Sequence, residues 1–87
     1  MIVEVGVPYT GWPVRRGIDY AFGSDFFSDQ LIKDLEIWAR DFNRLFNEIA
    51  GWPSEELRKR HHEQGEALAE RVRAELGPGY DVQMVAL

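Results

Sequence analysis

The most regular pattern of hydrophobic and polar positions lies between residues 28 and 49. Large apolar side chains recur there in steps of three and four residues, which places them on one face of an α-helix. These side chains belong to Phe27, Leu31, Leu35, Trp38, Phe42, Leu45, Phe46 and Ile49. The opposite face carries charged and amide side chains that favour water. The pattern therefore predicts a long amphipathic helix over residues 28–49 that forms the centre of the core.

Capping residues mark where the helices begin and end. Ser24 or Ser28 is the expected N-cap of the first helix, because a serine hydroxyl accepts a hydrogen bond from a free backbone N–H of the first turn. Gly51 suits the left-handed position that follows a helix. Pro53 suits the first turn of the next helix, where its missing N–H is not needed, and Ser54 is the competing N-cap. These residues predict a short turn between two helices.

A second helix is predicted from this turn to Leu76. Its inner face is a thinner apolar stripe, made of Leu57, His61, Gly65, Leu68, Val72 and Leu76. A glycine in the middle of a helix costs about 1 kcal/mol relative to alanine. We therefore expect the backbone at Gly65 to lie close to an aromatic ring of the first helix. The short turn makes the two helices antiparallel neighbours.

Three further segments show the alternation that is typical of β-strands. Residues 2–7 alternate valines with other residues and predict a strand, in which Gly6 marks a bulge or a close backbone approach. Residues 14–22 alternate more loosely and predict either a second strand or an extended loop over the core. Residues 80–87 follow a Gly-Pro-Gly stop and alternate again. They predict a terminal strand that pairs beside the first.

The order of these elements defines the fold class. We predict an α+β fold in which a two- or three-stranded sheet is covered on one face by an antiparallel helical hairpin, in the order β-(β)-α-α-β. A chain of 87 residues is the length of one domain, so residues 1–87 are expected to form a single domain. The terminal strand would lie at a sheet edge, where a second copy of the chain can pair.

The composition narrows the range of partners. Acidic residues outnumber basic ones by 15 to 10, and a formal net charge of −5 argues against binding to the phosphate backbone of nucleic acids. The same charge leaves room for a basic partner. The chain contains no cysteine, which excludes disulfides and a cysteine nucleophile. No apolar run approaches the roughly 18–20 residues of a membrane span, and the first residues lack a secretion signal. We therefore expect a cytoplasmic protein that binds neither nucleic acid nor membrane.

The densest group of aromatic and arginine residues outside the helices lies in the segment 9–26. Protein interfaces concentrate Trp, Tyr and Arg, and the guanidinium group suits bidentate binding of a carboxylate or phosphate. The predicted binding residues are Tyr9, Trp12, Arg15, Arg16 and Tyr20. The alternative is that the aromatic rings roof the core and the arginines pair internally with acids such as Asp19 or Asp25.

The sequence offers little catalytic chemistry. It contains no glycine-rich phosphate loop and no nucleophile elbow, and its serines lie in turn or cap contexts. His62 and Glu66 are one helical turn apart, a spacing that can share a divalent ion, but a site would need a third ligand from elsewhere. His61 lies on the inner stripe, where a packing role is expected. We predict no catalytic residue, no metal site and no cofactor.

The two helices carry a pattern of large and small residues with a family resemblance. Leu35, Trp38 and Phe42 fit L-x-x-W-x-x-x-[FW], and the second helix, with Gly65 and Leu68, is similar to E-G-x-x-L-A…E-L-G. The chain thereby resembles small uncharacterised proteins of actinobacteria, over residues 28–87. The resemblance implies no established activity, so it assigns no functional residue.

Three functions are compatible with these features. The first is a small acidic, non-enzymatic module that binds another protein, such as an immunity protein, an antitoxin or a regulator, because an acidic domain complements the basic face of a toxin. The second is a ligand-binding domain or small enzyme with a pocket between loop 9–26 and the helices, using Arg15 and Arg16 with His61 or His62. The third is a homo-oligomer formed through the edge strand. The first is our prediction.

Overall fold

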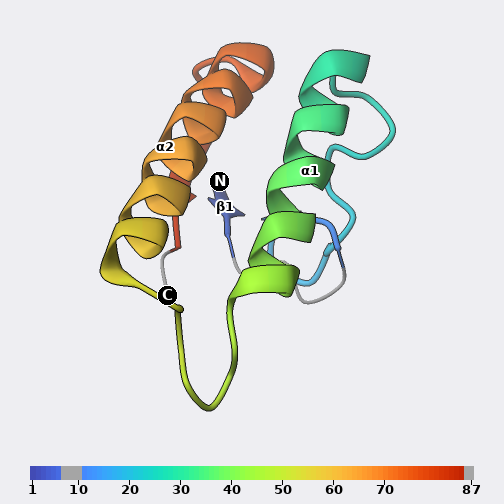
Figure 1. Cartoon of the computed structure of the whole chain (residues 1–87). Helices are drawn as coiled ribbons and strands as arrows, with labels where there is room; N and C mark the ends of the chain where they lie inside the picture. The colour runs from blue at the N-terminus through green and yellow to red at the C-terminus, as the bar shows by residue number, and fades with distance from the viewer. Residues whose placement is uncertain (7–10, 86–87) are drawn as a thin grey trace.

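The computed structural model describes residues 1–6 and 11–85, and it confirms the predicted α+β fold (Figure 1). The elements of this part of the chain are β1 (Ile2–Val5), β2 (Val14–Arg15), α1 (Asp29–Leu45), α2 (Glu55–Leu76) and β3 (Asp81–Met84). The strands form one sheet in the order β2-β1-β3, with β1 antiparallel to β2 and parallel to β3. The helical hairpin returns the chain to the sheet beside its first strand, as predicted.

The sheet buries one face against the two helices. Val3 and Val5 of β1 are fully buried, together with Val14 of β2 and Val82 of β3, so the valines of all three strands meet the helices on the same side. The other face of the sheet is open and mostly polar, with Asp81 and Gln83 exposed beside Ile2. Both helices lie side by side over the buried face in Figure 1. The alternation of the valines is therefore the signal that fixes which face of each strand is inside.

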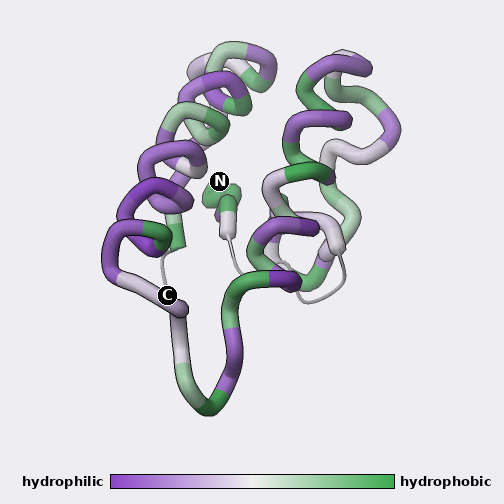
Figure 2. The backbone as a smooth tube through the Cα atoms, viewed as in Figure 1, coloured by the Kyte–Doolittle hydropathy of each residue, from purple (hydrophilic) through white to green (hydrophobic). Residues whose placement is uncertain are grey.

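Helix α1 supplies the largest share of the core. Its buried residues are Leu31, Leu35, Trp38, Ala39 and Phe42. Ser28 is its N-cap and accepts the backbone N–H of Leu31 at 3.3 Å. Hydrophobic and hydrophilic segments alternate along both helices in Figure 2, as expected when one face of each is buried.

The predicted end of α1 at Ile49 is wrong by four residues, because the helix ends at Leu45. Asn47 then competes with the helix, since its side-chain oxygen accepts the backbone N–H groups of Ile49 at 2.8 Å and Ala50 at 2.9 Å. Asn47 and Gly51 also exchange backbone hydrogen bonds of 3.0 and 2.7 Å. Ile49 is consequently 99% exposed. The turn projects beyond the ends of both helices in Figure 1.

Two predicted capping roles at this turn are also corrected. Gly51 has φ = 78°, so the prediction of a left-handed backbone holds, but this residue closes the turn six residues after the last residue of α1. Pro53 lies outside α2, because Ser54 is the N-cap and accepts the N–H of Leu57 at 3.1 Å. The competing assignment, Ser54, is therefore the observed one.

The loosely alternating segment 14–22 is a strand only at its start. Arg16 and Asp19 exchange backbone hydrogen bonds of 3.0 Å around Gly17, whose φ of 59° lets the chain reverse. The reversal ends β2 and turns the next residues outward, so that Ile18 is 93% exposed. Phe22 returns to the core. The rest of this segment is a loop, as in the alternative prediction, but it consists of successive turns and is not extended.

The glycine of α2 lies where the sequence predicted. Its backbone is so close to the core that an added Cβ would be 2.7 Å from Cζ2 of Trp38 and 2.3 Å from Cε of Met84. The close approach of Gly6 is confirmed as well, since an added Cβ there would be 2.1 Å from the carbonyl oxygen of Val85.

No helix in the described part of the chain is long and apolar enough to cross a bilayer.

Candidate functional site

The predicted binding residues do not all lie on one surface. Tyr9 lies outside the described residues. Trp12 is half-buried: its indole N–H donates to the carbonyl oxygen of Phe22 at 2.9 Å, and its ring lies 6.5 Å from that of Phe27. Trp12 therefore has the roofing role that was the alternative to binding, although one part of its side chain still lines a surface hollow.

The two arginines point in different directions. Arg15 lies on the open face of the sheet, where its Nε and Nη2 donate to the two carboxylate oxygens of Glu4 at 3.1 and 3.3 Å. That hydrogen-bonded pair raises the pKa of Arg15. Arg16 is exposed and its guanidinium carbon lies 5.9 Å from the centre of the Phe22 ring. Internal pairing thus holds for Arg15, with Glu4 as its partner in place of Asp19 or Asp25.

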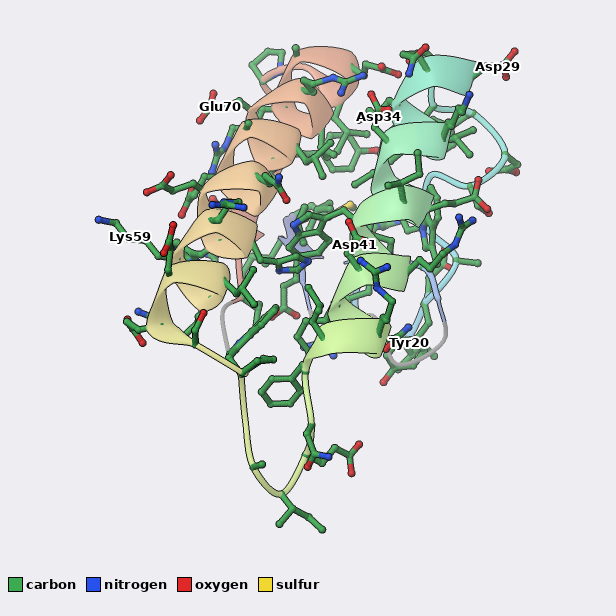
Figure 3. All side chains as sticks on the ribbon, viewed as in Figure 1. Tyr20, Asp29, Asp34, Asp41, Lys59 and Glu70 are labelled. Atoms are coloured by element: carbon green, nitrogen blue, oxygen red, sulfur yellow. The ribbon has the colours of Figure 1, made fainter. Side chains whose placement is uncertain are left out.

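Tyr20 lies at a hollow between the loop and the outer side of α1. This hollow has a volume of about 630 Å³ and is lined by Gly11, Trp12, Asp19, Tyr20, Ala21, Ser24 and Glu36. A second hollow of about 420 Å³ adjoins it and contains Arg16, Asp25 and Phe26. We call the surface formed by residues 16–26 and Glu36 the loop face. Tyr20 is labelled at the edge of the molecule in Figure 3, where its side chain points outward.

The loop face is apolar and acidic at once. Ile18, Tyr20 and Phe26 are exposed there, the last two by 54% and 55%. Within the described residues, Asp25 and Glu36 have no ion-pair partner, and the carboxylate of Asp19 accepts a hydrogen bond only from the backbone N–H of Ala21, at 3.1 Å. Elsewhere on the two helices, five acids each form an ion pair with an arginine: Asp34, Asp41, Glu55, Glu56 and Glu70. The unpaired negative charge is therefore available to a partner.

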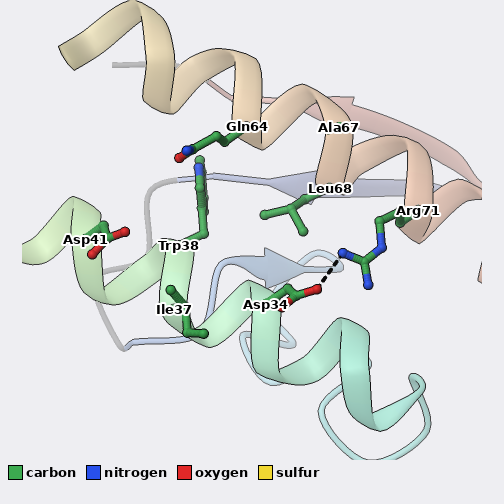
Figure 4. A pocket seen from close by; sticks show the side chains of 8 residues that line it. All are labelled: Asp34, Ile37, Trp38, Asp41, Gln64, Ala67, Leu68 and Arg71. Atoms are coloured by element: carbon green, nitrogen blue, oxygen red, sulfur yellow. Dashed lines mark hydrogen bonds and ion pairs between the residues drawn. The ribbon is translucent and has the colours of Figure 1, made fainter.

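A groove between the two helices is the second candidate surface. It has a volume of about 290 Å³, with Ile37, Trp38, Ala67 and Leu68 on its apolar side. Figure 4 shows Arg71 of α2 reaching across to Asp34 of α1, and the two side chains are joined by an ion pair of 2.7 Å. That ion pair lowers the pKa of Asp34. The ion pair between Arg71 and Asp34 thus closes one end of the groove and leaves neither charge unpaired.

His61 is a core residue. It is buried, and its ring stacks on that of Trp38 with the centres 4.2 Å apart. The indole N–H of Trp38 donates to the carbonyl oxygen of His61 at 2.9 Å, and Nε2 of His61 lies 3.0 Å from the carbonyl oxygen of Trp38. A carbonyl only accepts, so Nε2 carries the proton. This reciprocal pair joins the two helices and confirms the predicted packing role.

Burial lowers the pKa of His61, although the hydrogen bond to Trp38 opposes the shift. The folded protein loses stability when the pH falls through 6.5, the unfolded pKa of this histidine. The reason is that the unfolded chain then takes up the proton readily, whereas the folded chain, with its lower pKa, does not. We expect the free energy of unfolding to decrease between pH values of about 7.5 and about 5.5. His61→Gln keeps a donor but does not titrate, so urea unfolding should show a smaller decrease. Parallel profiles for the two proteins would contradict this assignment.

The remaining histidine, His62, contacts a carboxylate of its own helix. His62 and Glu66 lie on one face of α2, with Nε2 of the ring 3.4 Å from a carboxylate oxygen. Within residues 1–6 and 11–85, no group of three His, Cys, Asp or Glu side chains is placed to hold a metal ion. The geometry of this pair is that of a surface contact between successive turns of a helix.

Two acids that complete the loop face, Asp19 and Glu36, were not among the binding residues predicted from the sequence. Glu36 lies on the polar side of α1, where the helical pattern gives no reason to distinguish it from other solvent-facing acids. Asp19 was named only in the alternative interpretation, as an example of an acid that pairs with an arginine, but the turn at Gly17 presents its side chain at the hollow. Only the fold brings the loop and α1 together, so spacing along the chain carries no signal of this arrangement.

Comparison with known proteins identifies the family. Residues 15–86 match the model of a family described as Serratia CdiI immunity protein-like, and the chain therefore belongs to that family. Comparisons with curated proteins and with solved structures gave no match. Membership supports the prediction of an immunity-type domain that binds another protein. The matched residues include the loop face and both helices.

Proposed function

We propose that this member of the immunity protein-like family neutralises a toxin by binding it. The observation that carries the proposal is the family match over residues 15–86. The net charge of −5 supports it, because charge of one sign steers association with a partner of the opposite sign. The partner would accordingly present a basic surface. We place the encounter in the cytoplasm, in line with the sequence analysis.

The loop face is the proposed contact surface. Interfaces combine apolar anchors at the centre with polar groups at the rim, and Ile18, Tyr20 and Phe26 supply such anchors beside Asp19 and Asp25. Of the binding residues predicted from the sequence, Tyr20 and Arg16 lie on this surface. Trp12 would act mainly by supporting it from below, and Arg15 by holding the adjoining sheet.

A growth-rescue screen tests the proposed function. Genomic fragments of the source organism are expressed in a heterologous bacterial host, and those that stop growth are tested for rescue by this chain. We expect at least one growth-stopping fragment to be rescued and its product to bind the purified chain. Failure to recover any rescued fragment from a library that covers the genome would contradict the proposal.

Ile18→Ser/Tyr20→Ser tests the contact surface once the toxin is in hand. Removing two anchors should weaken binding by about tenfold or more, because each buried anchor contributes more than 1 kcal/mol at the centre of an interface. Ile49→Ser is the control, since Ile49 is as exposed as Ile18 but lies in the turn between α1 and α2, outside the loop face. Calorimetry should give near wild-type affinity for the control. Equal losses in the two proteins would place the contact elsewhere.

The predicted homo-oligomer remains a separate expectation. β3 is an edge strand of the sheet, and Nη2 of Arg73 donates to the carbonyl oxygen of Val82 at 2.7 Å. An arginine on an edge carbonyl occupies a group that an added strand would need. This contact favours a monomer, and light scattering at micromolar concentration would distinguish the two states.

A further inference from the structure

The hollow beside Tyr20 has an unusual combination of side chains. Two aromatic residues, Trp12 and Tyr20, and two carboxylates, Asp19 and Glu36, line the same space of about 630 Å³. No lysine or arginine is among the lining residues. Neither the acidic composition of the protein nor the packing of rings over the core explains why aromatic rings and unpaired carboxylates line the same hollow. The combination therefore calls for a specific ligand chemistry.

Positive charge is the chemistry that both kinds of side chain favour. The face of an aromatic ring attracts a cation through its quadrupole, and the attraction increases when the cation is partly desolvated. A carboxylate adds a charge-assisted hydrogen bond to an ammonium or guanidinium group. An aliphatic stem, in turn, packs on the apolar sides of the rings. A long basic side chain satisfies all three contacts.

Two of the lining side chains, those of Trp12 and Asp19, are held in place by hydrogen bonds without a ligand. The indole N–H of Trp12 donates to the carbonyl oxygen of Phe22, which fixes the ring. One carboxylate oxygen of Asp19 accepts the N–H of Ala21, which leaves the other for a partner. Glu36 projects from the middle of α1, a rigid element. Sites built on fixed groups lose less entropy on binding.

The nearby arginines do not fill the hollow. Arg15 is engaged by both oxygens of Glu4 on the open face of the sheet. Arg16 lines the neighbouring hollow and lies over the ring of Phe22. The negative charge of Asp19 and Glu36 is thus left without an ion-pair partner within the described residues.

We propose that the hollow formed by Trp12, Asp19, Tyr20 and Glu36 receives a single arginine or lysine side chain of the partner protein. This inference rests on the proposed function for the identity of the partner, the toxin, but the chemistry of the hollow can be tested without it. The inserted cation would be the specific contact at the centre of the loop face. Electrostatic attraction over the rest of the surface would act mainly on the rate of association.

The first test uses a blocked Gly-Arg-Gly tripeptide and the same peptide with citrulline, which has the shape of arginine without its charge. The readout is the indole N–H resonance of Trp12 in the full chain by NMR. The indole of Trp38 is an internal reference, because it is buried and bonded to His61. We expect a saturable shift of the Trp12 signal by the arginine peptide, with an affinity on the order of millimolar, and no shift by citrulline.

Glu36→Gln and Glu63→Gln complete this test. Both remove one exposed acid from a helix, but only Glu36 lines the hollow. Glu36→Gln should reduce the peptide-induced shift severalfold, whereas Glu63→Gln should leave it unchanged. Equal shifts by arginine and citrulline peptides, equal effects of the two variants, or no shift by either peptide would overturn the proposal.

The second test uses the toxin recovered by growth rescue. Glu36→Lys should weaken toxin binding by about ten- to hundredfold, because a cation would then face the inserted cation. Glu63→Lys makes the same charge change outside the hollow and should have less than about a threefold effect at physiological salt. Equal losses would overturn the proposed insertion and leave the immunity function standing. If no toxin is recovered, the proposed function fails and the peptide titration alone decides the chemistry of the hollow.

Discussion

Trp38→Ala is expected to lower the free energy of unfolding by about 3–5 kcal/mol. Trp38 is buried at the centre of the contact between α1 and α2, where it stacks on His61 and donates to its carbonyl oxygen. Truncation therefore removes a large apolar surface, leaves a cavity and breaks the link between the helices. A domain of this size has a total stability of about 5–15 kcal/mol, so the variant should melt at least about 12 °C below wild type by circular dichroism.

Two comparisons separate the contributions of Trp38. Ile49→Ala removes an apolar side chain that is 99% exposed and should change stability by less than about 0.5 kcal/mol. Trp38→Phe keeps an aromatic ring but has no N–H for the carbonyl oxygen of His61, so its cost should lie between those of the other two. A loss of less than about 1 kcal/mol for Trp38→Ala would show that the two helices are held together elsewhere.

Helical periodicity predicted the residues of this core because the geometry of a helix places residues three and four positions apart on one side, and that side is buried. Leu31, Leu35 and Trp38 repeat at intervals that any helix must bring to one side, and all three are buried. The same reasoning failed at Ile49, which fits the helical period but lies beyond the end of the helix, where the side chain of Asn47 accepts the backbone N–H of Ile49. Periodicity identifies which side of a helix is buried. The local competition of a side chain for the backbone decides where that helix ends.

The candidate site was less accessible to the same reasoning. Tyr20 was predicted from its residue type, and its exposure at the loop face agrees with an interface role without testing it. Glu36 was not distinguished from other acids, because its importance comes from the loop that folds against α1. Arg15 pairs with Glu4 across two strands, a contact that depends on strand register. Such sites depend on contacts between segments distant in sequence, for which a single sequence has no period to follow.

Gly65→Ala is expected to destabilise the protein, although alanine favours helices by about 1 kcal/mol over glycine. The new methyl group would lie 2.3 Å from Cε of Met84 and 2.7 Å from Cζ2 of Trp38. The end of the Met84 side chain can move, but the Trp38 ring is fixed by His61. Overpacking of this kind costs about 1–3 kcal/mol. We therefore expect a net loss of up to roughly 2 kcal/mol in urea unfolding, after the helical gain is subtracted.

A double-mutant cycle identifies the ring as the cause. Phenylalanine lacks the Cζ2 atom that the added methyl group would meet, so Gly65→Ala should be neutral or stabilising in a Trp38→Phe background. Ala74→Gly, at an exposed position of the same helix, should cost up to about 1 kcal/mol in either background, since helix propensity dominates there. If Gly65→Ala stabilised the protein with Trp38 intact, the helices could separate freely at this point. The absence of a side chain at residue 65 would then no longer explain how closely α2 packs on α1.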